Sequence, residues 1–328
     1  MIKVWALEDD RMGSQGQVKG VSAALDKTRY QVTEIKLEHS PFAKLPNRLL
    51  GASLWGITKA SRQKVDRDFP DLVISGSRRT APIARWIKKK SKNKAKIIQL
   101  MHPGNSGLKD FDLIFVAKHD AHKKSLPNFR FISGSPHRVT PEALKEAKAK
   151  WQEEFKNLPK PLTAVIVGGA IKGKAFSIDN AVALGRAIRE YVGRIGGSIL
   201  LTTSRRTGDL PEEAILNYVN KFPNHQYLWG LTPGDNPLMG YLACADSIIV
   251  TGDSVSMTSE ACGTGKPVFI FTGSNWLTSK HLRFVQSLYD ESYAAPLGVD
   301  INFRPKRRLD PASFIASEID GLFSDRLI

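Results

Sequence analysis

Residues 246–271 read DSIIVTGDSVSMTSEACGTGKPVFIF. The stretch begins with a β-branched apolar run that predicts a strand over residues 246–251. A loop of small and hydroxyl-bearing residues follows, and then the pattern predicts a helix over residues 256–263 and a second strand over residues 267–271. A strand, a helix and a second strand in this order predict a parallel β-α-β unit of an α/β protein.

The same alternation extends in both directions from this stretch. The 328 residues fit two domains of about 150 residues each. Pro159 and Pro161 follow a charged helix predicted over residues 141–155 and predict a linker, because proline ends helices. We therefore predict an N-terminal domain over residues 1–158 and a C-terminal domain over residues 162–328, whose last helix can return to the first domain.

Both predicted domains contain a run of strands alternating with helices. Further strands are predicted in these places: residues 2–7, 31–37, 71–75, 96–101, 113–116, 163–167 and 198–203. Two such units in succession predict two Rossmann-like domains that face a cleft, with ligands bound at the carboxyl ends of the strands.

The net charge of +16 is distributed unevenly. Residues 1–160 hold 32 Lys+Arg and 16 Asp+Glu, whereas residues 161–328 hold 16 of each. Residues 85–96 are rich in lysine, and residues 45–57 mix aliphatic residues, a tryptophan and cations, so together they could form a patch for an anionic membrane. Nucleic acid is the weaker alternative, because no recognition-helix, RNP or zinc-finger signature is present. A solubilising surface is the plain alternative.

Several features favour the cytoplasm, with the inner face of a membrane as a peripheral location. No apolar run approaches the ~18–20 residues needed to cross a bilayer. The N-terminus lacks the pattern of a signal peptide. Cys244 and Cys262 lie in apolar, helix-like contexts, which is typical of buried reduced thiols.

The loop and helix after residue 251 form the main candidate site. A helix start exposes unpaired backbone N–H groups, which favour phosphate together with the helix dipole. The hydroxyl-bearing residues beside them add donors, and Glu260 could accept hydrogen bonds from a ribose diol. The alternative is simple capping of the helix by Ser254 or Ser256. The candidate ligand-binding residues in this segment are Asp253, Ser254, Ser256, Met257, Ser259 and Glu260.

Two other loops should reach the same ligand from neighbouring strand ends. The loop at Gly168 and Gly169 offers close backbone approach, and Lys172 adds a cation. Residues 204–207 place two arginines just past a strand, and the planar guanidinium group suits a diphosphate. The candidates here are Ser204, Arg205, Arg206 and Thr207. An exposed turn is the alternative for the arginines.

The first loop, after the strand at residues 2–7, contains candidate catalytic residues. It matches neither a dinucleotide-binding nor a Walker A pattern, so it does not predict NAD or ATP as a cofactor. Its candidates are Asp9, Asp10 and Ser14, and a turn with helix-capping acids is the alternative. Asp110 and Asp112 resemble the DxD of metal-dependent sugar transferases, but they directly precede a strand. We therefore predict neither a metal nor a cofactor.

Several stretches of this sequence resemble the "elongated mitochondria" family of mitochondrial-fission proteins of plants and its bacterial relatives. The matching stretches are residues 167–169, 202–207, 236–237, 245–246 and 251–268, with weaker similarity at residues 77–82 and 119–120. The resemblance implies a GT-B-like fold. Residues 254–260 also look like those of peptidoglycan and lipopolysaccharide glycosyltransferases, which implies that Glu260 holds the donor ribose and that Ser254 and Ser256 contact phosphate.

The sequence departs from these relatives in the first loop. Relatives carry a histidine and an asparagine where this chain has Ser14 and Gly16, and a histidine there would be the natural general base. An acid of the first loop would have to replace it.

Two hypotheses follow. The first is a metal-independent GT-B-type glycosyltransferase that takes a nucleotide-diphosphate sugar as donor and an anionic, membrane-anchored acceptor. The second is a non-catalytic adaptor at a membrane surface, and a sugar-nucleotide epimerase is a weaker third reading.

Overall fold

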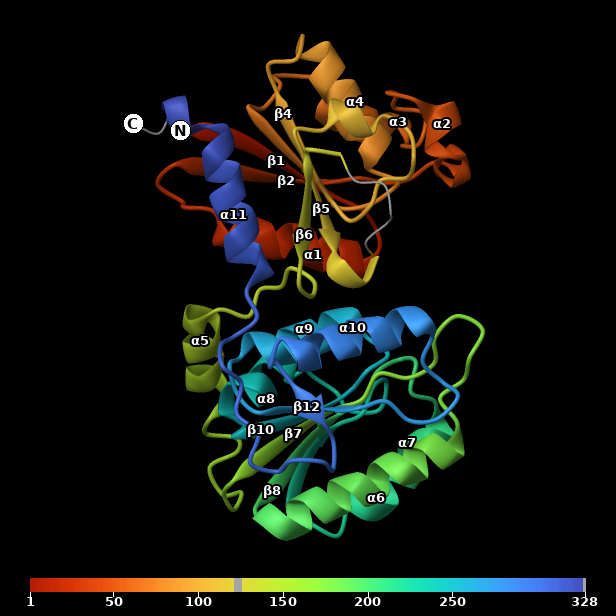
Figure 1. The fold of residues 1–328 in the computed structure, drawn as a ribbon, viewed down its shortest axis with the longest axis vertical. Coiled ribbons are helices and arrows are strands. Elements are labelled where there is room, and N and C mark those ends of the chain that lie inside the picture. Colours follow the sequence, from red (N-terminus) through yellow and green to blue (C-terminus); the bar gives the residue numbers. More distant parts are fainter. Residues whose placement is uncertain (121–125, 327–328) are drawn as a thin grey trace. The chain divides into compact units, whose positions relative to one another are not determined.

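The computed structural model describes residues 1–120 and 126–326. The chain divides into two compact units (Figure 1). Unit 1 comprises Met1–Arg138 together with Asp310–Ile328, and unit 2 comprises Val139–Leu309.

Unit 1 is built on a six-stranded parallel sheet with the strand order β2-β1-β3-β4-β5-β6. The order reverses direction beside β1, because β2 and β3 pair with its opposite edges. The strands are β1 (Ile2–Glu8), β2 (Tyr30–Lys36), β3 (Leu72–Ser75), β4 (Lys96–Leu100), β5 (Leu113–Ala117) and β6 (Phe129–Ile132). In open α/β sheets such a reversal opens a crevice at the carboxyl ends of the strands.

Helices cover both faces of this sheet. The helices α1 (Met12–Ala24) and α11 (Pro311–Leu322) share one core cluster with the strands, and α3 (Lys59–Val65) and α4 (Ala81–Lys90) share another. The short α2 (Asn47–Leu50) lies on the segment that connects β2 to α3. The chain thus returns to unit 1 after unit 2, because α11 buries Ile315 and Ile319 in the same cluster as Val18 and Val21 of α1.

Unit 2 repeats this design with the strand order β12-β11-β10-β7-β8-β9, again all parallel. Its strands are β7 (Leu162–Ile166), β8 (Ser198–Thr202), β9 (Asn224–Tyr227), β10 (Ser247–Thr251), β11 (Val268–Phe271) and β12 (Ala295–Pro296). The reversal lies between β7 and β10, since the chain adds β8 and β9 on one side and β11 and β12 on the other.

Two helix layers enclose the sheet of unit 2. The first comprises α6 (Ile178–Ile195) and α7 (Asp209–Val219), and the second comprises α5 (Pro141–Trp151), α8 (Leu238–Cys244), α9 (Val255–Gly263) and α10 (Ser279–Asp290). The helix α5 packs on α8, where the Trp151 side chain lies against Gly240, so it is part of unit 2. The sequence predicts a domain boundary after residue 158, which would assign α5 to the N-terminal domain, whereas the structure places the boundary before α5.

The predicted α/β class with two Rossmann-like sheets is confirmed. The sequence pattern did not identify β6, β9 and β12, which are all edge strands. An edge strand pairs on one side only and needs less apolar character, and β9 reads Asn-His-Gln-Tyr. Among the helices of residues 1–120 and 126–326, none combines the length and apolarity needed to cross a bilayer.

Candidate functional site

The main candidate site of unit 2 lies at the reversal of its sheet. Gly168 and Gly169 follow β7, and Asp253 and Ser254 follow the neighbouring strand β10. The Gly168 amide donates to Thr251 Oγ1 at 2.7 Å, and this hydrogen bond joins the two strand ends. The two segments that the sequence singled out are therefore adjacent in space.

Asp253 links these loops from inside the protein. Its side chain is fully buried and accepts from the Gly169 amide at 2.9 Å. The same carboxylate oxygen, Oδ2, pairs with Arg206 Nη1 at 2.8 Å, and Arg206 also donates to the carbonyl of Ala170. These contacts make Asp253 and Arg206 part of the scaffold of the site. Direct binding of a ligand by either residue stays a prediction.

The glycines are explained by close packing. A Cβ atom at Gly168 would overlap the Asp253 carboxylate, and one at Gly169 would overlap the backbone of Arg206. Only glycine lets the β7 loop pass so near its neighbours.

Two hydroxyl side chains also act within the protein. Ser204 Oγ and Thr207 Oγ1 both donate to the carbonyl of Gly168, at 2.6 and 2.5 Å. They fix the loop after β8 against the loop after β7. Their hydroxyl protons are therefore not available to a ligand in this arrangement.

Two cationic side chains beside these loops are exposed to solvent. Arg205 and Lys172 are exposed, and neither makes a hydrogen bond or ion pair within residues 1–120 and 126–326. The Ala170 amide donates to the carbonyl of Arg206 at 2.7 Å, so the loops that carry these two cations are joined. Of the two arginines predicted for diphosphate, Arg205 is the one with a free guanidinium group.

The start of α9 presents the predicted backbone donors. Ser254 caps the helix by accepting from the Met257 amide at 3.4 Å, so the capping alternative is also present. The amides of Val255 and Ser256 make no hydrogen bond in the described part of the chain. Such unpaired amides at a helix start attract anions.

Burial separates the side chains of α9 into two groups. Ser256 and Glu260 are half-buried and lie four residues apart, which places them on one face of the helix. Met257 is partly buried and packs against the core, and Thr258 and Ser259 are fully buried. Ser256 and Glu260 are thus accessible to a ligand, whereas the predicted contact through Ser259 is not supported by its burial.

Unit 1 holds the first-loop candidates at the reversal of its own sheet. Asp9 and Ser14 are buried, and Ser14 Oγ donates to Asp9 Oδ1 at 2.7 Å. Arg79, which follows β3, pairs with Asp9 Oδ2 at 3.2 Å and also with Asp10. Asp10 is exposed, so it is the candidate of the first loop that a substrate can reach.

These contacts set the protonation of both carboxyl groups. Burial opposes ionisation of Asp9, but hydrogen bonds with Ser77, Ser14 and the Arg11 amide outweigh it and lower its pKa. The hydrogen bond from Arg79 lowers the pKa of Asp10. Both groups are therefore ionised and weakly basic at neutral pH, which is a poor match for a general base.

The sequence did not identify His39, which follows β2. Its ligand atom and those of Asp9 and Asp10 all lie within 4.8 Å of one another. The ring nitrogen Nδ1 lies 3.2 Å from the carbonyl of Gly56, so Nδ1 carries the proton and Nε2 has a lone pair. Burial and the charge of Arg79 lower the pKa of His39, which keeps the ring neutral.

This cluster has a spacing that could suit a metal ion, but it already contains a cation. Arg79 is paired with both carboxylates. His39 Nε2 is covered and has no hydrogen-bond partner among the described residues. We therefore interpret the cluster as a salt-bridge network that fixes the first loop. No local sequence signal could have found His39, because it lies 29 residues from Asp10.

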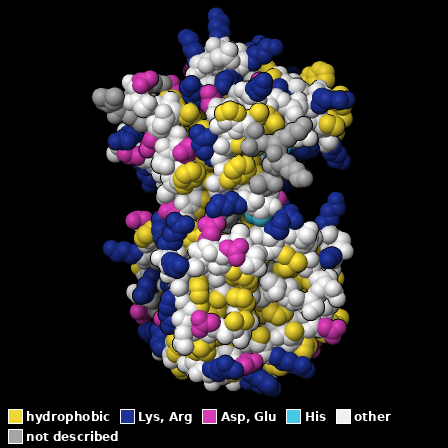
Figure 2. Space-filling view, in the orientation of Figure 1, with side chains coloured by type: hydrophobic (Ala, Val, Ile, Leu, Met, Phe, Trp, Pro, Cys, Tyr) yellow, Lys and Arg dark blue, Asp and Glu magenta, His cyan; other side chains and the backbone are white. Residues whose placement is uncertain are grey.

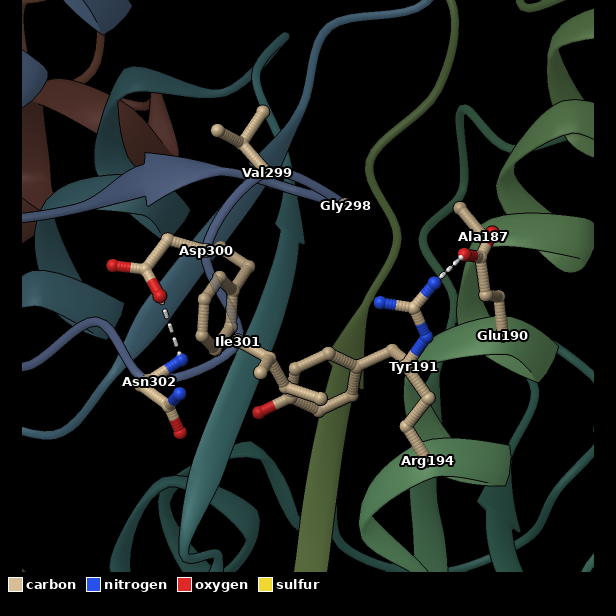
Figure 3. A pocket seen from close by; sticks show the side chains of 10 residues that line it. Ala187, Glu190, Tyr191, Arg194, Gly298, Val299, Asp300, Ile301 and Asn302 are labelled. Carbon is tan, nitrogen blue, oxygen red and sulfur yellow. Dashed lines mark hydrogen bonds and ion pairs between the residues drawn. The ribbon is translucent and has the colours of Figure 1, made fainter.

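Another hollow of unit 2 lies away from these loops (Figure 3). It has a volume of about 290 Å³ and is lined by the last turns of α6 and by residues 298–302. Arg194 pairs with Glu190 at 2.6 Å beside it. A helix that follows a parallel strand runs back toward the amino ends of the sheet, so this hollow is at the opposite end from the candidate site.

Comparisons with known proteins agree with this fold. A family model described as mitochondrial fission ELM1 matches residues 12–322. The mitochondrial fission protein ELM1 of Arabidopsis thaliana is 31% identical over 262 residues, which cover 73% of this chain and 60% of that protein. An uncharacterized protein, RP120, of Rickettsia prowazekii is 30% identical over 325 residues, which cover 89% of this chain and 90% of that protein.

Solved structures extend the likeness to sugar-nucleotide enzymes of the GT-B fold. One is the UDP-GlcNAc 2-epimerase of Methanocaldococcus jannaschii in complex with UDP-GlcNAc and UDP. It shares 12% identity and a TM-score of 0.53, over 98% of this chain and 100% of that chain. At this identity the likeness shows the fold alone. The match of the family model along most of the sequence is more specific, and the chain belongs to the mitochondrial fission ELM1 family.

Proposed function

We propose that this protein binds a nucleotide-diphosphate sugar through unit 2 and acts as a metal-independent GT-B-type glycosyltransferase on an anionic, membrane-anchored acceptor. The observation that carries the proposal is the start of α9, where unpaired amides and the accessible Ser256 and Glu260 lie at the reversal of the sheet. Diphosphate suits the amides, and a ribose diol suits the carboxylate.

The free cations complete the donor site. Arg205 and Lys172 would neutralise the diphosphate as it leaves, and no metal ion would be needed for this role. Asp253, Arg206, Ser204 and Thr207 hold the loops in place through contacts within the protein. In unit 1, Asp10 is the group we assign to the acceptor, because Asp9 and Ser14 are buried.

Titration calorimetry with UDP-GlcNAc and UDP tests the donor site. The Glu260→Ala and Arg205→Ala variants should each bind about tenfold or more weakly, since each loses a charge-assisted hydrogen bond. Glu213→Ala, which removes an exposed acid of α7, is the matched control and should bind normally. The binding panel contains several nucleotide sugars together with UDP and other nucleoside diphosphates. The donor proposal fails if the unaltered protein binds none of them.

A non-catalytic adaptor at the cytoplasmic face of a membrane is the second candidate. The low basicity of Asp9 and Asp10 favours it. Nucleotide-sugar binding without transfer or epimerisation of the sugar would support this candidate, and a sugar epimer formed from bound UDP-GlcNAc would support the epimerase alternative.

A further inference from the structure

The positive charge of unit 1 is concentrated in one stretch of sequence. Over residues 1–138 and 310–328, Lys+Arg outnumber Asp+Glu by 28 to 16, and over residues 41–96 alone by 15 to 3. The two differences are equal, so residues 41–96 account for the whole excess. This stretch includes α2, α3 and α4. Such a concentration of one charge attracts an anionic partner.

A hollow of about 310 Å³ opens on this surface. Its lining residues are Ala52, Arg85, Lys88, Lys89, Asn93, Lys109 and Asp110. Arg85 Nε pairs with Asp110 at 2.6 Å, and Lys88 pairs with Asp112 at 2.8 Å. Two of the four cations are therefore neutralised by acids of the protein.

The other two cations of the hollow are not neutralised. Lys89 and Lys109 are exposed, and neither has an ion-pair partner in residues 1–120 and 126–326. They come from α4 and from the short 3₁₀ helix at Leu108–Asp110, and they line the same hollow. Two ammonium groups around one hollow are suited to a phosphate group.

Three apolar side chains, Phe42, Leu49 and Trp55, are exposed on the segment that contributes Ala52 to this hollow, and we call them the apolar ridge. These side chains are 56%, 60% and 59% exposed. The segment folds back on itself, because Ser40 Oγ donates to the carbonyl of Trp55 at 2.5 Å and Ala43 packs on Gly56. Phe42 and Trp55 thus belong to stretches that lie side by side.

Three arginines hold this segment in place. Arg62 donates to the carbonyl of Leu54 at 3.1 Å, and Arg78 donates to that of Leu45 at 2.8 Å. Arg85 donates to the carbonyl of Gly51 at 3.0 Å and joins the segment to the hollow. The exposure of the ridge is therefore a feature of a well-anchored structure, and an exposed apolar cluster of this kind marks an interaction surface.

We infer that unit 1 docks on an anionic lipid bilayer, with a headgroup phosphate between Lys89 and Lys109 and with the apolar ridge in the interfacial region. Figure 2 shows Lys and Arg gathered over the part of unit 1 that carries α2 and α4 in Figure 1, with apolar side chains among them. Charge and an exposed tryptophan together fit a membrane interface better than a nucleic acid. Only one part of this inference depends on the proposed function, namely that the acceptor is held in the same membrane.

Cosedimentation with vesicles tests the cationic part. The vesicles contain phosphatidylcholine with about a third phosphatidylserine, at physiological ionic strength. The Lys89→Gln, Lys109→Gln double variant should bind the vesicles about thirtyfold more weakly than the unaltered protein. This value follows because each lysine near an anionic surface contributes about 1 kcal/mol to binding. The Lys145→Gln, Lys148→Gln double variant of α5 removes the same charge from unit 2. It should partition within about twofold of the unaltered protein, because these lysines are not part of the proposed docking surface.

A second pair of variants tests the apolar ridge. Trp55→Ser should weaken partitioning about tenfold, because the indole ring no longer enters the interface. Phe314→Ser removes an exposed aromatic side chain from α11 and should leave partitioning unchanged. The fluorescence of Trp55, compared between the unaltered protein and Trp55→Ser, should shift to shorter wavelength on binding.

Several outcomes would overturn the inference. One is equal binding to vesicles of pure phosphatidylcholine, and another is an equal loss of binding in the test and control variants. Binding to duplex DNA that is tighter than to vesicles and insensitive to Trp55→Ser would assign the surface to nucleic acid instead. These variants leave the α9 site intact, so UDP-GlcNAc binding, measured on the same samples, reports separately on the proposed function.

Discussion

At the scale of single residues, neighbouring side chains in one motif have opposite roles. Arg206 is tied to the buried Asp253, whereas Arg205 beside it is exposed and has no partner among the residues that the structure describes. Asp9 is buried in a net of hydrogen bonds, whereas Asp10 beside it is exposed. The sequence predicted each pair as a unit, because adjacent residues of the same type look equivalent until their surroundings are known.

The Asp9 carboxylate should stabilise unit 1 in a pH-dependent way. Its pKa is lowered in the folded protein, so its contribution is present above the ordinary pKa near 4 and is lost as the pH falls through the lower folded value. We expect Asp9→Asn to reduce the free energy of unfolding by about 1–3 kcal/mol at pH 7. Urea unfolding at several pH values measures this difference.

The control for this prediction is Asp68→Asn, which changes an exposed acid of unit 1. Its effect should stay within about 0.5 kcal/mol at every pH. A deficit for Asp9→Asn that stays constant down to the acid-unfolding range would show that ionisation of Asp9 contributes nothing.

At the scale of elements, α9 and the loop after β7 show how far a local pattern reaches. The helix was predicted from residue 256, and it begins at Val255 with Ser254 as its cap. The Gly168–Gly169 pair was predicted to allow close approach of a ligand. In the structure the space beside both glycines is filled by Asp253 and by the backbone of Arg206.

Replacing Gly168 should therefore damage the scaffold of the site. A Cβ atom would overlap the buried Asp253 carboxylate, and Gly168→Ala should cost about 1–3 kcal/mol of stability and weaken UDP binding. Gly193→Ala, at an open position of α6, should instead stabilise the protein by about 0.5–1 kcal/mol. Thermal unfolding of both variants compares them directly, and equal stability of the two would contradict the packing argument.

At the scale of the whole molecule, the order of the chain does not follow the order of the units. The helix α11 comes after unit 2 but buries Ile315, Ile319 and the nearby Phe323 in the core of unit 1. The sequence predicts residues 162–328 as one domain whose last helix can return to the first domain. The apolar spacing of this helix predicts a buried face, but the spacing cannot specify which core buries that face.

Thermal unfolding should reveal that α11 stabilises unit 1. Ile319 is fully buried, so Ile319→Ala should lower the stability of unit 1 by about 2–5 kcal/mol. Phe314→Ala, on the exposed side of the same helix, should change it by less than about 0.5 kcal/mol. Calorimetry should show that Ile319→Ala moves one thermal transition and leaves the other in place. A shift of the unit 2 transition alone would contradict this assignment of α11.

The sequence by itself determined the alternation of strands and helices, the two parallel sheets and the capped, hydroxyl-rich start of α9. These features depend on periodicity and on neighbours within about four residues, which a linear pattern records. Only the tertiary structure decided which arginine is free, that His39 meets Asp9 and Asp10, and which unit holds α11. Those outcomes depend on partners far apart in the chain, such as Gly169 and Asp253, which are 84 residues apart. Burial and pairing at such separations are set by how the elements pack, and no local pattern encodes them.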